Sequence, residues 1–402
     1  MLGNKMKLKM AFAVHGRFHA FDLGRELVRQ GVDLTLLTNY PKKVVERFGL
    51  PRSCVVNCVA HGIASRLAHR LLGSRSKLFE PTLHRCFSRW ASNVVSQKEF
   101  NVIHSFSGVS EELFQNVSKP CVLKSLVRGS AHIKVQSRLL KEEAMRCGVK
   151  MDSPSPWMIG REQREYQLAD VLFVLSTFAQ KSFLEQGYPA DKLRVLPLGS
   201  QLELFRPASD VIDQRRSRIL SGQPLRVLTI GSFSFQKGCL DLAQMVQKAA
   251  SKFNFQFVGD LPAESKALRN DISGRMQFTQ RLPQRELPPV YAGADLFLFP
   301  TIQDGYAVVL SQAQASGLPI LATPNCAAPD IIKEGETGWI CPIRSPAQFL
   351  ERLKWCDEHR QELAGIVRRS YDEFKPRDWW DVAADLVRIC SEQLENSQAK
   401  HG

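Results

Sequence analysis

The sequence lacks the signatures of several common protein classes. Its ten cysteines form no CxxC pair, and there is neither zinc-finger spacing nor an RNP motif, so we expect no metal site and no nucleic-acid partner. No GxGxxG, internal repeat or low-complexity tract is present. No apolar run approaches the length of a membrane span, and Ala11–Val14 is too short for the core of a signal peptide. Together with the scattered thiols, this favours a reducing, cytoplasmic location.

Length and charge set the next limits. A chain of 402 residues, 44% apolar and 23% charged, is typical of a globular protein with two α/β domains of about 200 residues each. Residues 1–200 hold 30 Lys and Arg against 16 Asp and Glu, whereas residues 201–402 hold 24 of each. The asymmetry predicts that the first domain faces something anionic, such as a membrane surface, an acidic glycan or a phosphate-bearing acceptor. The alternative is a solvated basic face without a specific partner.

The most basic stretch, residues 63–95, has helical periodicity. Its basic members are Arg66, His69, Arg70, Arg75, Lys77, Arg85 and Arg89, interleaved with Leu67, Leu71, Leu72, Phe79, Leu83, Phe87 and Trp90. A basic amphipathic surface predicts peripheral contact with anionic lipid. The alternative is an ordinary helix whose apolar face lies in the core.

The first half opens with the pattern of a doubly wound sheet. Lys7–Val14 predicts a strand, residues 20–30 a helix and Val32–Leu37 a second strand. The loop between the first strand and the helix contains Gly16, which we expect at the carboxyl edge of the sheet, where ligands bind. Further strands are predicted at 101–106, 121–127 and 169–176, and Glu142 and Glu143 are expected on a solvent-facing helix.

The second half repeats the αβ rhythm and adds groups suited to phosphate. After a predicted strand at Leu225–Ile230, a loop runs from Gly231 to Gly238, with Lys237 at the start of the next helix. A lysine beside a glycine at a helix start is a point-charge ligand for phosphate. Between these halves, residues 207–224 are polar with little apolar periodicity, and we expect a linker there.

A strand–turn–helix–strand unit spans residues 294–323. The apolar runs 296–299 and 320–322 flank a turn at Asp304-Gly305 and a helix of small apolar residues. Free N–H groups and the positive end of the helix dipole face outward at such a turn, which suits the pyrophosphate of a nucleotide. An ordinary crossover helix with a chance polar pair is the alternative.

The same stretch carries a family resemblance. An acid, a glycine, an aromatic and a small residue (Asp304 to Ala307) are followed by Gln312, eight positions after the acid, and then by Gly317-x-Pro319. This pattern resembles the donor site of retaining GT-B glycosyltransferases of the GT4 family, and residues 178–207 resemble that family's interdomain segment. The family usually has Glu at both ends of the spacing, glycine where Ala307 stands and arginine where Ser232 stands.

The resemblance implies an α/β fold of the GT-B type, with two Rossmann-like doubly wound domains facing each other across a cleft. Residues 1–207 would form the acceptor-side domain, completed by a C-terminal helix (377–395) that crosses back to it. Residues 208–376 would bind the nucleotide-sugar donor.

The implied activity is transfer of a hexosyl unit from a nucleoside diphosphate sugar to a glycan, lipid-linked or other acceptor, with retention at the anomeric carbon. Bacterial surface polysaccharide or glycoconjugate synthesis would be its setting. No cofactor or metal is implied. Asp304 would hold sugar hydroxyls, Gln312 the ribose, and His132, just past a strand, the sugar or the incoming acceptor. The remaining implied donor-site residues are Gly16, Gly231, Ser232, Lys237, Arg281, Gly305, Tyr306, Ala307 and Val308, with His132, Lys237 and Asp304 as the catalytic set.

Two other functions stay open. Gln312, Ala307 and Ser232 together fit a non-catalytic relative that binds a sugar nucleotide and assists a partner. A different GT-B enzyme, such as a sugar-nucleotide epimerase or a phosphorylase, would share the architecture.

Overall fold

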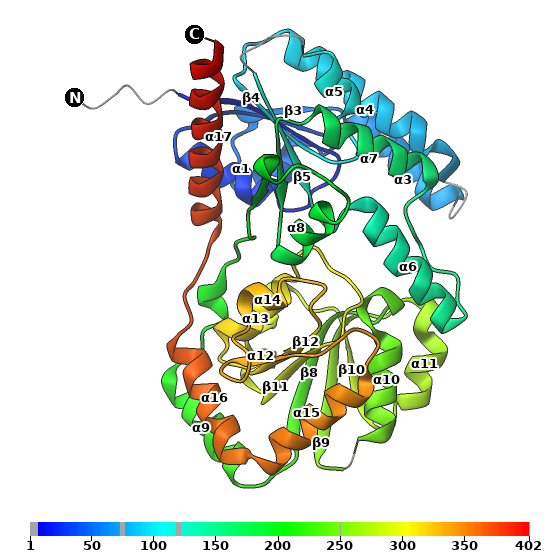
Figure 1. The fold of residues 1–402 in the computed structure, drawn as a ribbon, viewed down its shortest axis with the longest axis vertical. Coiled ribbons are helices and arrows are strands. Elements are labelled where there is room, and N and C mark those ends of the chain that lie inside the picture. Colours follow the sequence, from blue (N-terminus) through cyan, green and yellow to red (C-terminus); the bar gives the residue numbers. More distant parts are fainter. Residues whose placement is uncertain (1–6, 73–76, 118–121, 250, 402) are drawn as a thin grey trace, which may run out of the picture.

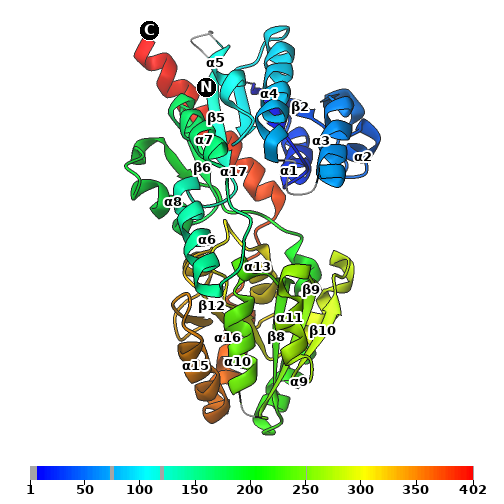
Figure 2. The same cartoon turned by 90° about the vertical axis from the view of Figure 1, so that its right-hand side faces the viewer.

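The computed structural model describes residues 7–72, 77–117, 122–249 and 251–401. They form two α/β lobes, one above the other in Figures 1 and 2, each built around a parallel sheet. The start of the N-terminal segment (residues 1–6), Arg75 of the basic stretch and Cys121 of the strand expected at 121–127 lie outside the described residues.

The first lobe contains a seven-stranded sheet in the order β3-β2-β1-β4-β5-β6-β7. Its central strands β1 and β4 are buried along nearly their whole length, and β4 and β5 also bury the polar residues His104, Ser105 and Ser125. The strands are β1 (Lys9–Val14), β2 (Asp33–Thr38), β3 (Val55–Asn57), β4 (Val102–Phe106), β5 (Leu123–Arg128), β6 (Val171–Val174) and β7 (Leu193–Val195). The helices are α1 (Ala20–Arg29), α2 (Lys42–Glu46), α3 (Val59–Leu72), α4 (Glu80–Ser96), α5 (Glu111–Gln115), α6 (Ile133–Cys147), α7 (Pro156–Leu168) and α8 (Thr177–Leu184).

The second lobe contains a six-stranded sheet in the order β10-β9-β8-β11-β12-β13. The strands are β8 (Leu225–Ser232), β9 (Phe253–Asp260), β10 (Met276–Gln280), β11 (Leu296–Phe299), β12 (Ile320–Ala322) and β13 (Gly338–Ile340). The helices are α9 (Ser209–Leu220), α10 (Cys239–Lys248), α11 (Lys266–Ile272), α12 (Pro288–Ala292), α13 (Val308–Ala315), α14 (Ala328–Ile331), α15 (Pro346–Glu358) and α16 (Arg360–Asp372). The prediction of two doubly wound domains is confirmed.

The last helix, α17 (Trp379–His401), leaves the second lobe and runs along the first, against α1 (Figure 1). Its buried residues Val382, Leu386 and Cys390 recur at four-residue spacing and join the core of the first sheet. The return of the C-terminal helix to the first domain is therefore also confirmed.

The predicted linker is wrong in its main part. Residues 209–220 form α9, which packs against α16 and buries Ile212, Arg215 and Ile219. Arg215 donates to the carbonyl oxygens of Ser316 (2.6 Å) and Tyr291 (3.0 Å). A residue of the predicted linker is therefore buried against the core of the second lobe. Buried arginines are rare unless their donors are used in this way.

The second lobe also forms ion pairs with α6 of the first lobe. The guanidinium of Arg344 pairs with Glu143 (2.9 Å) and Glu142 (3.0 Å), and Arg146 pairs with Asp241 (2.7 Å). The side chain of Glu143 is fully buried, so the expected solvent-facing position is wrong for this residue. Its partner Arg344 lies 201 positions away, where helical periodicity carries no information.

Within the described residues, no helix is both long and apolar enough to span a bilayer.

Replacing Leu386 by alanine tests the docking of α17. Leu386 is fully buried in the first core, so we expect the first domain to lose about 2–5 kcal/mol of stability, measured by denaturant unfolding. Leu220→Ala is the control, because Leu220 is exposed and its loss should change stability by no more than about 0.5 kcal/mol. Equal effects of the two variants would contradict this packing.

Candidate functional site

A cavity of about 650 Å³ lies between the two lobes. It is lined from the first lobe by His15, Phe18, His19, Asp22, His84, Phe106, Ser107, Val109, Arg128, Gly129, Ser130, Leu175 and Leu198, with Trp379 from α17. The second lobe contributes Ile230, Gly231, Lys237, Phe299, Asp304, Tyr306, Ala307, Val308 and Val309.

Sheet topology explains this location. Strand order reverses between β1 and β4 in the first sheet and between β8 and β11 in the second. Connections leave such a switch point in opposite directions, which opens a crevice at the carboxyl ends of the strands. The cavity is lined by the loops that follow β1, β4, β8 and β11, so two switch points face each other across it.

Lys237 reaches the cavity from the short turn Phe235–Lys237, which follows β8 and leads into α10. The turn closes at Gly238, which has φ +75°, and an added Cβ there would collide with the carbonyl oxygen of Pro300. Glycine is therefore required, and the tight turn brings the lysine to the loop that follows β11. The Lys237 Nζ lies 2.5 Å from Asp304 Oδ2.

Asp304 joins this lysine to the start of α13. Its Oδ1 accepts hydrogen bonds from the N–H groups of Tyr306 and Ala307, both at 3.1 Å. A carboxylate at a helix start is stabilised by the free N–H groups and by the helix dipole. One side chain thus shields both the positive helix end and the lysine that an anionic ligand would contact.

The turn before α13 is strained. Ala307 has φ +69°, a left-handed conformation that costs a residue with a Cβ roughly 1–2 kcal/mol. This conformation accounts for the glycine of the resembling family. It also turns the chain so that Val308 and Val309, whose N–H groups belong to the first turn of α13, line the cavity.

The first-lobe wall consists mainly of imidazole and aromatic rings. Burial, with His84 and His61 nearby, lowers the pKa of His15 to about 3, and burial lowers that of His19 to about 4, so both are neutral at pH 7. Phe18, whose backbone has φ +40°, stacks on Phe106 at 5.4 Å between ring centroids. This wall offers flat apolar faces and uncharged nitrogens.

The cationic side chains that line the cavity, Lys237 and Arg128, are both paired. Arg128, at the end of β5, lies 3.1 Å from Glu162 and donates to Gln136. The excess positive charge of the first half therefore does not converge on the cavity. Among the described residues, no three His, Cys, Asp or Glu side chains have the arrangement of a metal site.

The prediction of a cleft histidine at position 132 is corrected. His132 does not line the cavity: it is 4% exposed, caps α6 by accepting from the Lys134 N–H, and packs edge-on against Phe183. The histidines on the cavity are His15, His19 and His84. His15 and His19 follow β1, in the loop where we had singled out Gly16 alone.

Three other predicted donor residues lie off the cavity. Gln312 lies on the buried face of α13, where its Oε1 accepts from the Tyr291 hydroxyl at 2.9 Å. Arg281 is largely exposed, lies 3.5 Å from Asp260 and does not line the cavity. Ser232 ends β8 and does not line the cavity, although Gly231 does.

Gly16 and Gly305 shape the site through their backbones. Gly16 has φ +113° and donates its N–H to Asn39, which holds the loop after β1 in place. The Gly305 carbonyl accepts from Ser176 of the first lobe at 2.8 Å, and Ser130 donates to Gln303 at 2.9 Å. The two lobes therefore touch directly beside Asp304.

Sequence reasoning found the second-lobe wall better than the first. His15 and His19 both lie within five residues of the predicted end of the first strand, and this spacing could have marked them as cavity residues. His84 lies in the first half of α4, and nothing in its local sequence distinguishes it from a surface residue.

Comparison with known proteins agrees with this geometry. Residues 224–357, most of the second lobe, match the family model described as glycosyl transferases group 1. Over 393 residues the chain is 24% identical to D-inositol 3-phosphate glycosyltransferase of Corynebacterium efficiens, covering 92% of this chain and 88% of that protein. It is 25% identical over 186 residues to the amylovoran biosynthesis glycosyltransferase AmsK of Erwinia amylovora, covering 43% of this chain and only 44% of AmsK.

Among solved structures, Anabaena HepE in complex with UDP has a TM-score of 0.65 at 13% identity, covering 98% of this chain and all of HepE. HepE has also been solved with UDP-glucose, at a TM-score of 0.62. At this identity the likeness establishes the GT-B fold of the chain.

The contact between the lobes can be tested at Gly305. A Cβ there would collide with the carbonyl oxygen of Gly129, whereas a Cβ on Gly129 itself would meet nothing within 4 Å. We expect Gly305→Ala to destabilise the closed arrangement by about 1–3 kcal/mol, seen as a lower unfolding temperature and a larger radius of gyration in small-angle scattering. Gly129→Ala should leave both unchanged; an unaltered Gly305→Ala protein would show that the lobes do not meet here.

Proposed function

We propose that this protein is a glycosyltransferase that moves a hexosyl unit from a nucleoside diphosphate sugar to a glycan, lipid-linked or other acceptor, with retention at the anomeric carbon. Polysaccharide or glycoconjugate synthesis is its setting. The observation that carries the proposal is the meeting of Lys237 with the start of α13 on one wall of the inter-lobe cavity. A cation and a helix N-terminus together suit a diphosphate.

The chemistry follows from the leaving group. When the bond between the anomeric carbon and the diphosphate breaks, the negative charge on the departing oxygen increases. Lys237 and the N–H groups of Val308 and Val309 stabilise that charge, the kind of electrostatic help that commonly dominates catalysis. Asp304 holds Lys237 and the N–H groups of Tyr306 and Ala307, so the diphosphate takes over the Lys237 contact, and the Asp304 carboxylate becomes free for sugar hydroxyls.

The relatives support this choice of donor and setting. HepE was solved with UDP and with UDP-glucose, and AmsK is named for amylovoran biosynthesis. No cofactor is required in the proposed reaction, and catalysis does not depend on a metal ion, because Lys237 and α13 supply the positive charge.

A panel of nucleotide sugars tests the function. In water alone, an active transferase should slowly release free nucleoside diphosphate from at least one donor, and proton NMR of the released sugar should first show the anomer of the donor. Added EDTA should leave the rate unchanged. Affinity without turnover would favour the non-catalytic relative, and an altered sugar still attached to the nucleotide would favour an epimerase.

Lys237→Gln is the matched variant in this assay. It removes the charge and leaves a shorter, neutral polar side chain, so UDP affinity measured by calorimetry should fall about 10- to 100-fold, the worth of a charged hydrogen bond. Arg281→Gln is the control, because Arg281 does not line the cavity. Equal losses in both variants would indicate that the diphosphate binds elsewhere.

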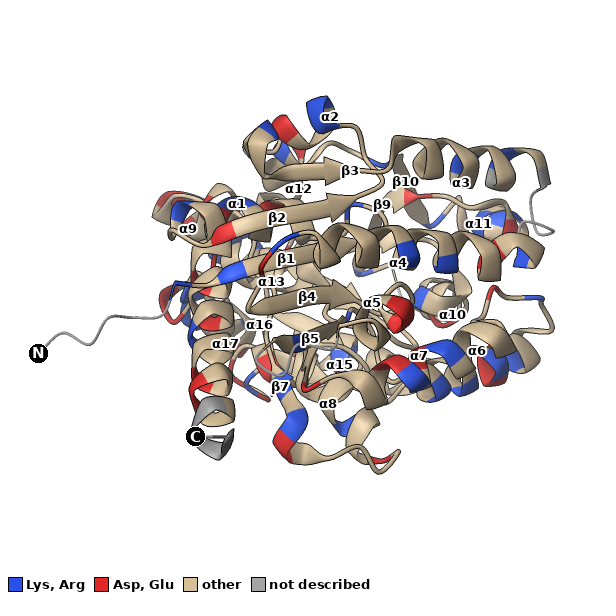
Figure 3. Cartoon of the chain, turned by 90° about the horizontal axis from the view of Figure 1, so that it is seen from above, with Lys and Arg blue, Asp and Glu red and all other residues tan. Residues whose placement is uncertain are grey.

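We also propose that the first lobe rests on an anionic membrane through α3 and the segment after it. Ile63, Leu67 and Leu71 recur at four-residue spacing on α3 and are all exposed, as are Leu78 and Phe79. Between Arg47 and Lys98, the sequence has nine Lys and Arg and one acid, Glu80. Figure 3 shows Lys and Arg along α3 and α4.

This surface differs from an ordinary core-facing helix, because its apolar stripe points outward. Leu71 and Leu78 are 75% and 77% exposed. Apolar side chains ringed by cations fit the interface of a bilayer, where the chains enter the acyl boundary and the cations meet anionic headgroups.

Vesicle flotation tests the membrane contact. The protein should float with phosphatidylglycerol-containing vesicles and remain behind with pure phosphatidylcholine, and binding should weaken in high salt. Leu67→Glu/Leu71→Glu should abolish flotation while donor hydrolysis continues, and Leu204→Glu, an exposed leucine of the interdomain segment, is the control. If the double variant instead changes the oligomeric state and flotation is absent, the stripe contacts a second copy of the chain.

A further inference from the structure

The first-lobe wall holds a cluster of three imidazoles. His15, from the loop after β1, lies with its ring centroid 5.1 Å from that of His61 in α3 and 5.3 Å from that of His84 in α4. His15 and His84 line the cavity. The buried nitrogens His15 Nε2 and His61 Nδ1 have no hydrogen-bond partner within the described residues. Buried polar atoms are usually satisfied, so a hydroxyl or a water is expected beside them.

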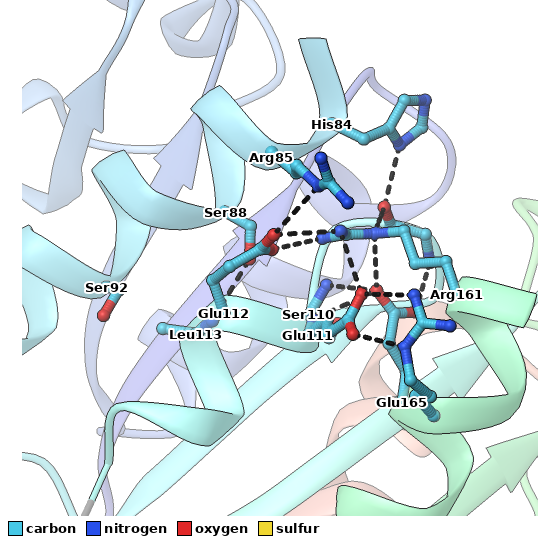
Figure 4. A network of polar contacts seen from close by, with 12 residues as sticks. His84, Arg85, Ser88, Ser92, Ser110, Glu111, Glu112, Leu113, Arg161 and Glu165 are labelled. Atoms are coloured by element: carbon cyan, nitrogen blue, oxygen red, sulfur yellow. Dashed lines mark hydrogen bonds and ion pairs between the residues drawn. The ribbon is translucent and has the colours of Figure 1, made fainter. Parts of the chain in front are cut away.

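The tautomer of His84 follows from its partner. Its Nδ1 lies 2.8 Å from the carbonyl oxygen of Gly108. A carbonyl oxygen can only accept, so Nδ1 carries the proton and Nε2 has a free lone pair. Figure 4 shows the second ring nitrogen turned away from the polar network.

A buried ionic network holds that carbonyl in place. The Arg161 side chain is fully buried, and its Nε donates to the Gly108 oxygen at 2.7 Å while its other nitrogens pair with Glu111 and Glu112 (Figure 4). Glu165 accepts the N–H groups of Gly108 (2.5 Å) and Ser110 (2.7 Å). Buried charges are costly unless fully paired, and a paired network fixes its neighbours rigidly. The ring of His84 is thus held in one orientation.

The surroundings also keep His84 uncharged. Burial lowers its pKa below 6.5, an effect opposed by the Gly108 carbonyl and enhanced by Arg161 of α7. The other groups facing it are Glu80 of its own helix, His15 and His61. At neutral pH the ring therefore presents an acceptor.

The acidic side chains that line the cavity are less available as hydrogen-bond acceptors for a ligand, because both are already paired. Asp304 is held by Lys237 and by the start of α13, and Asp22 by Arg25 at 3.3 Å and Arg17 at 3.6 Å. His84 therefore offers a fixed, neutral acceptor on the wall opposite the proposed diphosphate site.

We propose that His84 binds the attacking hydroxyl of the acceptor, with Nε2 accepting its hydrogen bond and aiming the oxygen at the donor. His15, which also lines the cavity, holds a neighbouring hydroxyl or water of the same neutral, polyol-type acceptor. This inference rests on the proposed function.

Two substitutions distinguish the roles of the two ring nitrogens of His84, Nδ1 and Nε2. His84→Asn keeps a donor for the Gly108 carbonyl and removes the group at Nε2. His84→Gln places an amide oxygen near the Nε2 position but cannot titrate. With the donor selected from the panel and water as acceptor, hydrolysis by His84→Asn should fall about 10- to 100-fold, whereas His84→Gln keeps most of the rate. Calorimetric affinity for UDP should stay within about twofold in both.

The pH profile provides the second readout. The wild-type rate should fall as the pH drops through the pKa of His84, below 6.5, because protonation removes the lone pair. His84→Gln should lose this acidic limb, which a purely structural role would not change. His359→Asn is the control, because its Nδ1 also bonds a backbone carbonyl, that of Trp355, but lies in the second lobe and off the cavity.

The outcomes are distinct. Normal hydrolysis by His84→Asn, or an unchanged acidic limb in His84→Gln, overturns the role of His84 while the proposed function stands. If the wild-type protein binds UDP but turns over no donor, the proposed function and this inference fail together.

Discussion

The ion pair between Lys237 and Asp304 is the contact on which the second-lobe wall depends. It joins the loop after β8 to the loop after β11, the two strands between which the sheet order reverses. The same carboxylate closes the first turn of α13 and so fixes the strained Ala307 backbone. One side chain thus covers both the lysine and the free N–H groups at the start of α13.

The opposite wall is built on a different principle. Its rings come from the loop after β1, from β4, α4 and the C-terminal helix, and its histidines are uncharged because burial penalises the imidazolium. The charged residues that line this wall, Arg128 and Asp22, are paired, and a further paired network around Arg161 lies behind it. Positive charge for a leaving group on one side and neutral acceptors for hydroxyls on the other suit a transfer between two sugars.

The basic residues that line the cavity differ from those on the outer surface of the first lobe. The cations that line the cavity are neutralised by Asp304 and Glu162, whereas α3 and α4 carry arginines beside an exposed apolar stripe. The net charge of +14 therefore describes an outer surface of the first lobe and not the substrate site. Composition alone left open an acidic glycan, a phosphate-bearing acceptor, a membrane surface and a solvated basic face without a specific partner.

The sequence by itself determined the two doubly wound sheets and the turns that carry Lys237 and Asp304. These features depend on local periodicity or on a short turn, so neighbouring residues carry the whole signal. The return of the C-terminal helix was implied by the family resemblance and not by its own periodicity. Tertiary structure alone decided that His132 packs beneath α6 and α8 while His84 faces the cavity, that Gln312 pairs with Tyr291, and that the polar segment 209–220 is a helix with a buried arginine. Those positions depend on partners far away in the chain, and the packing of whole elements, not their local sequence, sets which face of a helix or loop is turned inward.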